Sequence, residues 1–232
     1  MKDVLIDGYK FISIPFEKAE MIFSTAENNL DFDRKKEIGI KNIQNIKKWF
    51  GVKEVGFLNQ IHSDKIIDYD GKRHEADAFI TNKRNAAVGV FTADCVSVLL
   101  YDKVSQVIAA VHSGWRGTLS CVVYKTIEKM EREYSCKGED ITAVIGPHIH
   151  ECCYEVSEEL IEKFTNTPIY KNVNIHKGRH LNMQNCIVHQ LELKKVKDIR
   201  NLNICTFCSK DYKTHSYRKN QDGRMFSFIF LK

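Results

Sequence analysis

Six short apolar segments follow one another in the middle of the chain, and they restrict the fold more than any other feature of the sequence. Their apolar runs are bounded by polar and turn-forming residues, which is typical of strands that pair into a sheet. The six segments are residues 54–62, 65–70, 76–82, 87–94, 96–102 and 107–113. A sheet built from them needs other elements to cover its faces.

Helical patterns flank these strands. Apolar residues recur at helical spacing in "RKKEIGIKNIQNIKKWF" (residues 34–50). Further helices are expected at residues 117–135, 157–166 and 182–196, and Ser157 is the expected N-cap of the second. Short strands are expected within residues 1–30 and at 141–147. The C-terminal residues 214–232 are expected to form a hairpin that turns at Asp222-Gly223. The pattern predicts a mixed α/β (α+β) fold in a single domain over residues 1–232, with helices covering the sheet faces.

The composition predicts a cytoplasmic protein that binds neither nucleic acid nor membrane. The 232 residues are 43% hydrophobic, and the net charge of +5 is spread along the chain without a basic block. No run of about 18 uncharged apolar residues is present, and Asp3 and Asp7 interrupt any N-terminal signal sequence. In such a protein, eight cysteines favour buried thiols, a metal site or a nucleophile over disulfides.

Three potential metal ligands stand where strands are expected to end. They are His62 in "NQIHSD", Cys95 in "TADCVSV" and His112 in "AAVHSGWRG". Imidazole nitrogen and thiolate sulfur both suit zinc, and three protein ligands leave a fourth position open for water or substrate. The alternative is that the histidines are ordinary hydrogen-bonded groups and the cysteine is a small buried side chain.

The residues beside these three could bind substrate. Gly114 and Gly117 let the backbone turn closely, and the helix expected after them would give Arg116 an anion-binding role. A surface salt bridge is the alternative for Arg116. Asp94 could orient a ligand or transfer protons, or it could be a structural carboxylate. For Trp115, core packing is favoured over stacking on a base.

Several segments together resemble the laccase-domain family, also called the YfiH family. They are "NQIHSD", "ADAFITN", "FTADCVSVLLYD", "AAVHSGWRGT", "IGPHIHECCYEV", "CTFCS" and "SYRKNQDGRMFSFIFL". They occur in the family's order from about Asn59 onward, and "TADC" followed by "H-x-GWRG" is the most specific signature. Ser113, where alanine is common, and the extra histidines of "GPHIHECC" depart from the pattern without touching a predicted ligand.

The resemblance implies a fold, a metal and an activity. The fold is an α/β/β/α sandwich similar to the catalytic domain of cytotoxic necrotizing factor toxins. The resemblance also implies that the protein is a monomer. The metal ligands, also the catalytic residues, are His62, Cys95 and His112, with Zn²⁺ as the ion and Cu²⁺ as an alternative. The activity is phosphorolysis of adenosine, inosine, guanosine and S-methyl-5′-thioadenosine, with deamination of adenosine. Arg218 becomes a candidate substrate-binding residue beside Arg116 and Asp94.

The remaining cysteines and histidines carry weaker signals. Cys205 and Cys208 in "CTFC" have the spacing of half a zinc knuckle, but no second C-x-x-C is present, and the adjacent pair Cys152-Cys153 is poorly suited to complete it. We therefore expect buried thiols near the site. His148 and His150 fall on one strand face if extended, although a surface loop is favoured.

Three other functions remain open at this stage. A copper polyphenol oxidase is one, suggested by the family's older name, and two histidines and one cysteine are also the equatorial ligand set of a blue-copper site. A four-copper oxidase would need many more than nine histidines and one H-x-H pair. A metal-free hydrolase of peptidoglycan precursors is the second, with Cys95 as nucleophile and His112 as base. The third is a binding module without catalytic activity.

Overall fold

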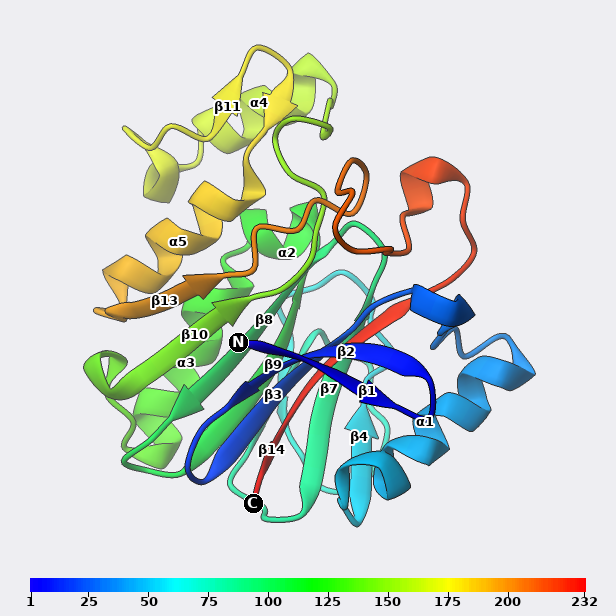
Figure 1. Cartoon of the computed structure of the whole chain (residues 1–232). Coiled ribbons are helices and arrows are strands. Elements are labelled where there is room, and N and C mark those ends of the chain that lie inside the picture. Colours follow the sequence, from blue (N-terminus) through cyan, green and yellow to red (C-terminus); the bar gives the residue numbers. More distant parts are fainter.

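Two six-stranded sheets packed face to face form the centre of the computed structural model, which describes residues 1–232 (Figure 1). The first sheet contains, in spatial order, β1 (Lys2–Ile6), β2 (Tyr9–Pro15), β3 (Ala19–Ser24), β14 (Met225–Leu231), β7 (Ala86–Thr92) and β4 (Glu54–Phe57). The second contains β13 (Asp198–Asn201), β10 (Ile141–Ile145), β8 (Val96–Asp102), β9 (Val107–Ser113), β6 (Ala78–Thr81) and β5 (Ile66–Asp68). A small separate pair is β11 (His176–Lys177) with β12 (His180–Leu181).

Helices lie on the outer faces of both sheets (Figure 1). The α-helices are α1 (Glu37–Phe50), α2 (Trp115–Leu119), α3 (Val122–Tyr134), α4 (Glu158–Thr165) and α5 (Met183–Leu193). Short 3-10 helices are η1 (Glu27–Asn29), η2 (Gly138–Asp140), η3 (Pro168–Tyr170) and η4 (Tyr217–Lys219). Helix α1 covers the first sheet, and the other helices share a core with the second. The mixed α/β fold expected from the sequence is confirmed.

Alternating side chains along the strands build the three cores of this sandwich. In β9, Ala109 and Val111 face the helices, whereas Ile108 and Ala110 face the other sheet. The period of two is the strand's own geometry. Because His112 has the parity of Ile108 and Ala110, its side chain falls between the two sheets, at the end of the strand.

Most predicted elements are confirmed. Strands β8 and β9 have the bounds expected from the sequence, and the predicted N-cap of α4 is present because the Ser157 hydroxyl accepts a hydrogen bond from the Leu160 amide (3.3 Å). The first predicted strand, residues 54–62, ends at Phe57. The residues after it leave the sheet and lead to His62. No helix is long and apolar enough to cross a membrane.

The single helix predicted over residues 117–135 is wrong, because the structure breaks it into α2 and α3. The break is at Cys121, which has a left-handed φ of 60°. In a continuous helix the Thr118 carbonyl would accept from residue 122. Here it accepts from the Cys121 amide (3.1 Å), which tightens the last turn of α2, and also from the Tyr170 hydroxyl (2.5 Å) and the Gln190 amide (3.0 Å). The two distant side chains stabilise the break, which a local pattern does not reveal.

The predicted C-terminal hairpin is also wrong. Only its second half is a strand, β14, and this strand pairs with β3 on one side and β7 on the other. With both edges occupied, the preceding residues have no edge on which to pair. They cross to the end of the sandwich, where the Arg218 amide donates to Oδ2 of Asp94 (3.0 Å).

Candidate metal and substrate site

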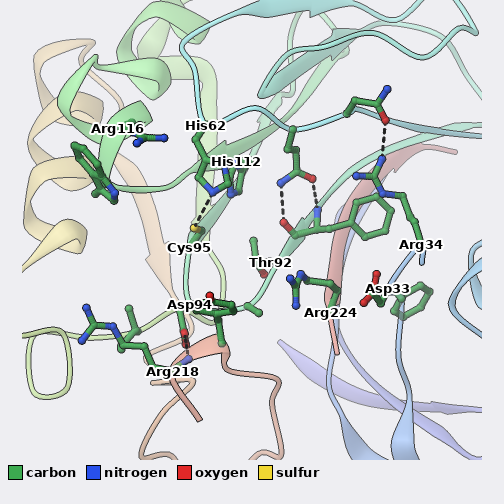
Figure 2. Close-up of a pocket in the computed structure, with 18 of the residues that line it drawn as sticks. Asp33, Arg34, His62, Thr92, Asp94, Cys95, His112, Arg116, Arg218 and Arg224 are labelled. Carbon is green, nitrogen blue, oxygen red and sulfur yellow. Dashed lines mark hydrogen bonds between the residues drawn. The ribbon is translucent and has the colours of Figure 1, made fainter. Parts of the chain in front are cut away.

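His62, Cys95 and His112 meet at one end of the sandwich (Figure 2). His112 lies near the end of β9, and Cys95 directly precedes β8, its antiparallel neighbour. His62 comes from the loop after β4 with a left-handed φ of 59°. Cys95 Sγ lies 3.9 Å from His62 Nε2, and one donor atom from each of the three residues lies within 4.8 Å of the others. Residues far apart in sequence thus form one compact donor set.

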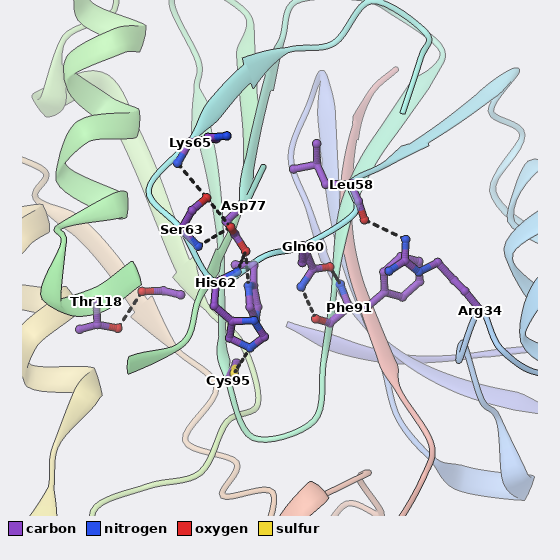
Figure 3. Close-up of polar contacts among 12 residues, drawn as sticks. Arg34, Leu58, Gln60, His62, Ser63, Lys65, Asp77, Phe91, Cys95 and Thr118 are labelled. Carbon is purple, nitrogen blue, oxygen red and sulfur yellow. Dashed lines mark hydrogen bonds and ion pairs between the residues drawn. The ribbon is translucent and has the colours of Figure 1, made fainter. Parts of the chain in front are cut away.

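Asp77, which sequence reasoning missed, organises this set (Figure 3). Its fully buried carboxylate accepts from Nδ1–H of His112 (2.8 Å), the His62 amide (3.0 Å) and both the amide and hydroxyl of Ser63 (2.6 and 2.7 Å). The bond to Nδ1 leaves Nε2 of His112 as the nitrogen that a metal ion could bind. A histidine ligand oriented by a carboxylate is the usual arrangement around protein-bound zinc. The only signal in the sequence is one acidic residue inside the apolar segment 76–82.

The electrostatics of the set favour the thiolate. Burial raises the pKa of Cys95, but the His112 and His62 imidazoles outweigh burial and lower this pKa to about 6. Burial lowers the pKa of His112, but Cys95 and Asp77 outweigh burial and raise it to about 9. Without a cation the pair therefore holds its proton on the imidazole. A metal ion would replace that proton and bind a sulfur that is already anionic.

The donor set fits a single zinc ion. With zinc–nitrogen bonds of about 2.0 Å and zinc–sulfur bonds of about 2.3 Å, tetrahedral donors lie roughly 3.5 Å apart. The 3.9 Å between Cys95 Sγ and His62 Nε2 is close to that separation. Two nitrogens and one sulfur leave a fourth position free, as in catalytic zinc sites.

Gly114 gives this donor set its space. A Cβ at this position would lie 3.0 Å from His62 Cδ2 and 3.1 Å from Cys95 Sγ. We expect Gly114→Ala to displace both side chains and weaken zinc binding about tenfold while the chain still folds. Competition with a zinc chelator measures the affinity. Gly178→Ala is the control, because a Cβ at this glycine between β11 and β12 would meet nothing within 4 Å; equal affinities in the two variants would contradict the prediction.

A cavity of about 900 Å³ opens beside the donor set. It is lined by six basic side chains and only two acidic ones, so its walls are electropositive. The basic residues are Arg34, Lys35, Arg73, Arg116, Arg218 and Arg224; the acidic ones are Asp33 and Asp94; the aromatic ones are Phe32, Phe91, Trp115, Tyr154 and Tyr217.

The three predicted substrate residues all line this cavity. The Arg116 guanidinium lies over the Trp115 ring (5.0 Å from its centroid), and that of Arg218 over the Tyr154 ring (4.8 Å). Asp94 has a left-handed φ of 88° and accepts from the Thr206 hydroxyl (2.6 Å) and the Arg218 amide. Both of its oxygens are thus occupied, so Asp94 positions neighbouring loops.

The opposite wall contains residues that sequence reasoning missed. Asp33 and Arg34 precede α1, and Arg224 precedes β14 (Figure 2). One oxygen of Asp33 accepts from the Lys35 amide (3.0 Å), and the other accepts no hydrogen bond. The charged run "DFDRKK" was the available signal, but nothing local connects it to ligands that lie elsewhere in the chain.

Two minor predictions are corrected. The sequence makes Cys152 and Cys153 poor partners for Cys205 and Cys208, yet the structure brings all four sulfurs together. His148 was expected in a surface loop, yet it is fully buried, with Nδ1–H donating to the Gly146 carbonyl (2.8 Å). In both cases the parallel neighbours β10 and β13 draw their following loops together.

The buried His148 predicts a pH dependence of stability. Burial, with a smaller contribution from His150, lowers its pKa to about 3. Between this value and the unfolded value of about 6.5, only the unfolded chain takes up the proton, so the free energy of unfolding should fall by about 2 kcal/mol from pH 7 to pH 5. Urea denaturation measures it. In His148→Asn an amide replaces the Nδ1 donor without titrating, and the fall should be smaller by that amount; identical slopes would contradict the assignment.

Together these features define a class: an α/β protein of two packed sheets with helices outside, and a His-Cys-His pocket at one end. The chain belongs to the family described as multi-copper polyphenol oxidoreductase laccase, whose model matches residues 20–232. The resemblance inferred from the motifs is thereby confirmed.

Relatives and solved structures agree with this assignment. The chain is 51% identical to a purine nucleoside phosphorylase of Clostridium acetobutylicum over 98% of both chains. It is 34% identical to one of Aquifex aeolicus, over 80% of this chain and 87% of that one. The structure of hypothetical protein YfiH from Bacillus licheniformis superposes with a TM-score of 0.82 at 26% identity, covering 92% of this chain and 93% of that one.

Proposed function

We propose that this chain is a zinc-dependent purine nucleoside phosphorylase. Its substrates are phosphate and the nucleosides adenosine, inosine, guanosine and S-methyl-5′-thioadenosine, and the same pocket deaminates adenosine. The names of the relatives support the reaction class. The observation that carries the proposal is the electropositive cavity directly beside the His-Cys-His donor set.

The charge of the cavity favours this function over a polyphenol oxidase. Phosphate is a dianion near neutral pH, and arginine binds its oxygens through paired hydrogen bonds. A neutral phenol has no charge to pair with six basic side chains and could make only the weaker cation–π contacts with them. The arginines come from separate segments that converge on one space, which favours an anionic substrate over a set of solvated surface charges.

Phosphorolysis exchanges one bond at the ribose for another. A phosphate oxygen bonds to C1′ as the glycosidic C–N bond breaks, and the base leaves with that electron pair and gains a proton. We assign Arg218 and Arg224 to phosphate binding and Asp33, with its unpaired oxygen, to the ribose hydroxyls. Trp115 and Tyr154 each carry a guanidinium over the ring, so we assign the purine to Tyr217, an exposed aromatic side chain that lines the same cavity. Holding both reactants in this geometry supplies much of the rate enhancement.

The zinc ligands are His62, Cys95 and His112, with Asp77 fixing the orientation of His112. Zinc held by these residues would supply Lewis acidity next to the cavity. We propose that the active species is a monomer, as the resemblance to the laccase-domain family implies.

Product analysis tests the proposal. Protein with quantified zinc is incubated with each nucleoside, with and without phosphate, and the free base and ribose 1-phosphate are measured. We expect phosphate-dependent release of base that a strong chelator abolishes and added zinc restores. Turnover that survives chelation would favour the cysteine hydrolase. Oxygen consumption with a phenol and copper, without base release, would favour the oxidase.

Arg224→Gln tests the phosphate assignment separately. The variant should raise the KM for phosphate about tenfold or more while leaving zinc content unchanged, because a charge-assisted contact of about 1.5–3 kcal/mol is lost. Arg179→Gln is the matched control, since Arg179 pairs with Glu155 on the surface outside the cavity. If both variants have the wild-type KM, phosphate does not bind at Arg224.

A further inference from the structure

Four cysteine sulfurs gather outside the site described above. They belong to Cys152, Cys153, Cys205 and Cys208, and all lie within 4.8 Å of one another. Sγ of Cys152 is 3.6 Å from Cys153, 3.9 Å from Cys205 and 3.6 Å from Cys208. None of the four forms a disulfide.

The backbone fixes this arrangement. Strands β10 and β13 are parallel neighbours, so the chain leaves both at the same edge of the second sheet. Beyond that edge the two loops stay paired, because the His148 amide donates to the Ile204 carbonyl (3.2 Å) and the Thr206 amide to the His148 carbonyl (2.9 Å). The His150 amide then donates to Sγ of Cys205 (3.5 Å). The backbone hydrogen bonds between the two loops therefore hold the four sulfurs close together.

The separations match a tetrahedral metal ion. Four thiolates at about 2.3 Å from one zinc ion lie about 3.8 Å from each other. A disulfide instead needs its sulfurs at about 2.05 Å, which no pair here approaches. Cysteines that serve only as small packing side chains are not expected to cluster four together at this sulfur–sulfur distance. We propose that Cys152, Cys153, Cys205 and Cys208 bind a second zinc ion, with four protein ligands and no open position.

Such a closed site has a structural role. Cys153 adjoins Tyr154, which lines the cavity, and Cys205 adjoins Thr206, whose hydroxyl donates to Asp94. The ion would thus clamp together two loops that build one wall of the cavity. This proposal does not depend on the nucleoside reaction, because it concerns metal binding alone.

Zinc stoichiometry tests the proposal with a variant that spares the core. Cys152 and Cys208 are both exposed, so Cys152→Ala/Cys208→Ala is expected to fold. Purified under reducing conditions, it should contain about one zinc equivalent less per chain than the wild type. Cys121→Ser, which alters a cysteine outside both clusters, should keep the wild-type content.

Cobalt substitution gives a second readout. In the wild type five Co–S bonds contribute to the thiolate charge-transfer absorption, four here and one at Cys95, so the double variant should lose about four-fifths of it. Circular dichroism and retention of the metal at Cys95 show that the variant has folded. Unchanged zinc content and unchanged cobalt absorption in the double variant would overturn the proposal, as would a disulfide among these cysteines in freshly isolated protein.

Discussion

Cys95→Ala is expected to lower kcat/KM for phosphorolysis by about 10⁴-fold, because catalytic groups that act as one unit fail together. In the proposed site the Cys95 thiolate would be the only anionic ligand, and two neutral imidazoles alone bind zinc weakly. The variant should lose the zinc at this cluster while keeping the overall fold, since Cys95 is only partly buried and lies between strands β7 and β8. Zinc analysis and steady-state kinetics on the same preparation measure both effects.

The matched control is Cys121→Ser, which changes a cysteine outside both the His-Cys-His set and the four-cysteine cluster and should keep wild-type turnover. A Cys95→Ala variant with full turnover and full zinc content would contradict the site assignment. Loss of turnover with full zinc content at the His-Cys-His cluster would instead identify Cys95 as a nucleophile.

Asp77→Asn should weaken zinc binding by about 10–100-fold, as is typical when the carboxylate behind a histidine ligand is lost. The carboxylate faces hydrogen-bond donors only: Nδ1–H of His112, the amide of His62 and two groups of Ser63. An amide group would turn an N–H toward one of these donors. We therefore also expect the free energy of unfolding to fall by about 2–4 kcal/mol. Chelator competition and urea denaturation measure the two effects.

Asp64→Asn is the control for Asp77→Asn. Asp64 lies two positions from His62 but is exposed and pairs with Lys125 (2.5 Å). An exposed ion pair contributes less than about 1 kcal/mol, so zinc affinity and stability should stay near their wild-type values. Similar losses in both variants would show that the loop around His62, and not the buried carboxylate, controls the site.

The sequence predicted that His62, Cys95 and His112 would meet, because two of them stand at strand ends that follow from local pattern. His112 and Cys95 sit at the ends of two strands whose bounds follow from their apolar runs. Asp77 could not be predicted in the same way. Its role depends on the pairing of β6 with β9, which places Ala78 opposite Val111 and so brings Asp77 beside His112.

The far wall of the cavity depends on still longer-range information. This wall comes from the layers around the first sheet: Asp33 and Arg34 precede α1, and Arg224 precedes β14. These residues reach the site only because the two sheets pack face to face. The failed hairpin has the same cause. The Asp222-Gly223 pair is a proper turn signal, but local chemistry does not reveal that β14 inserts between β3 and β7.

The central place of β14 has a consequence for biogenesis. Ser227 pairs with both Phe23 and Val90, so the first sheet cannot close until a segment about 200 positions beyond β3 has been translated. Until then the emerging polypeptide exposes two apolar edges that are prone to associate with other chains. Folding dominated by such distant pairings is slow. We therefore expect a chain that ends before Met225 to aggregate and to be cut by protease in both sheets, because residues of the two sheets share one core.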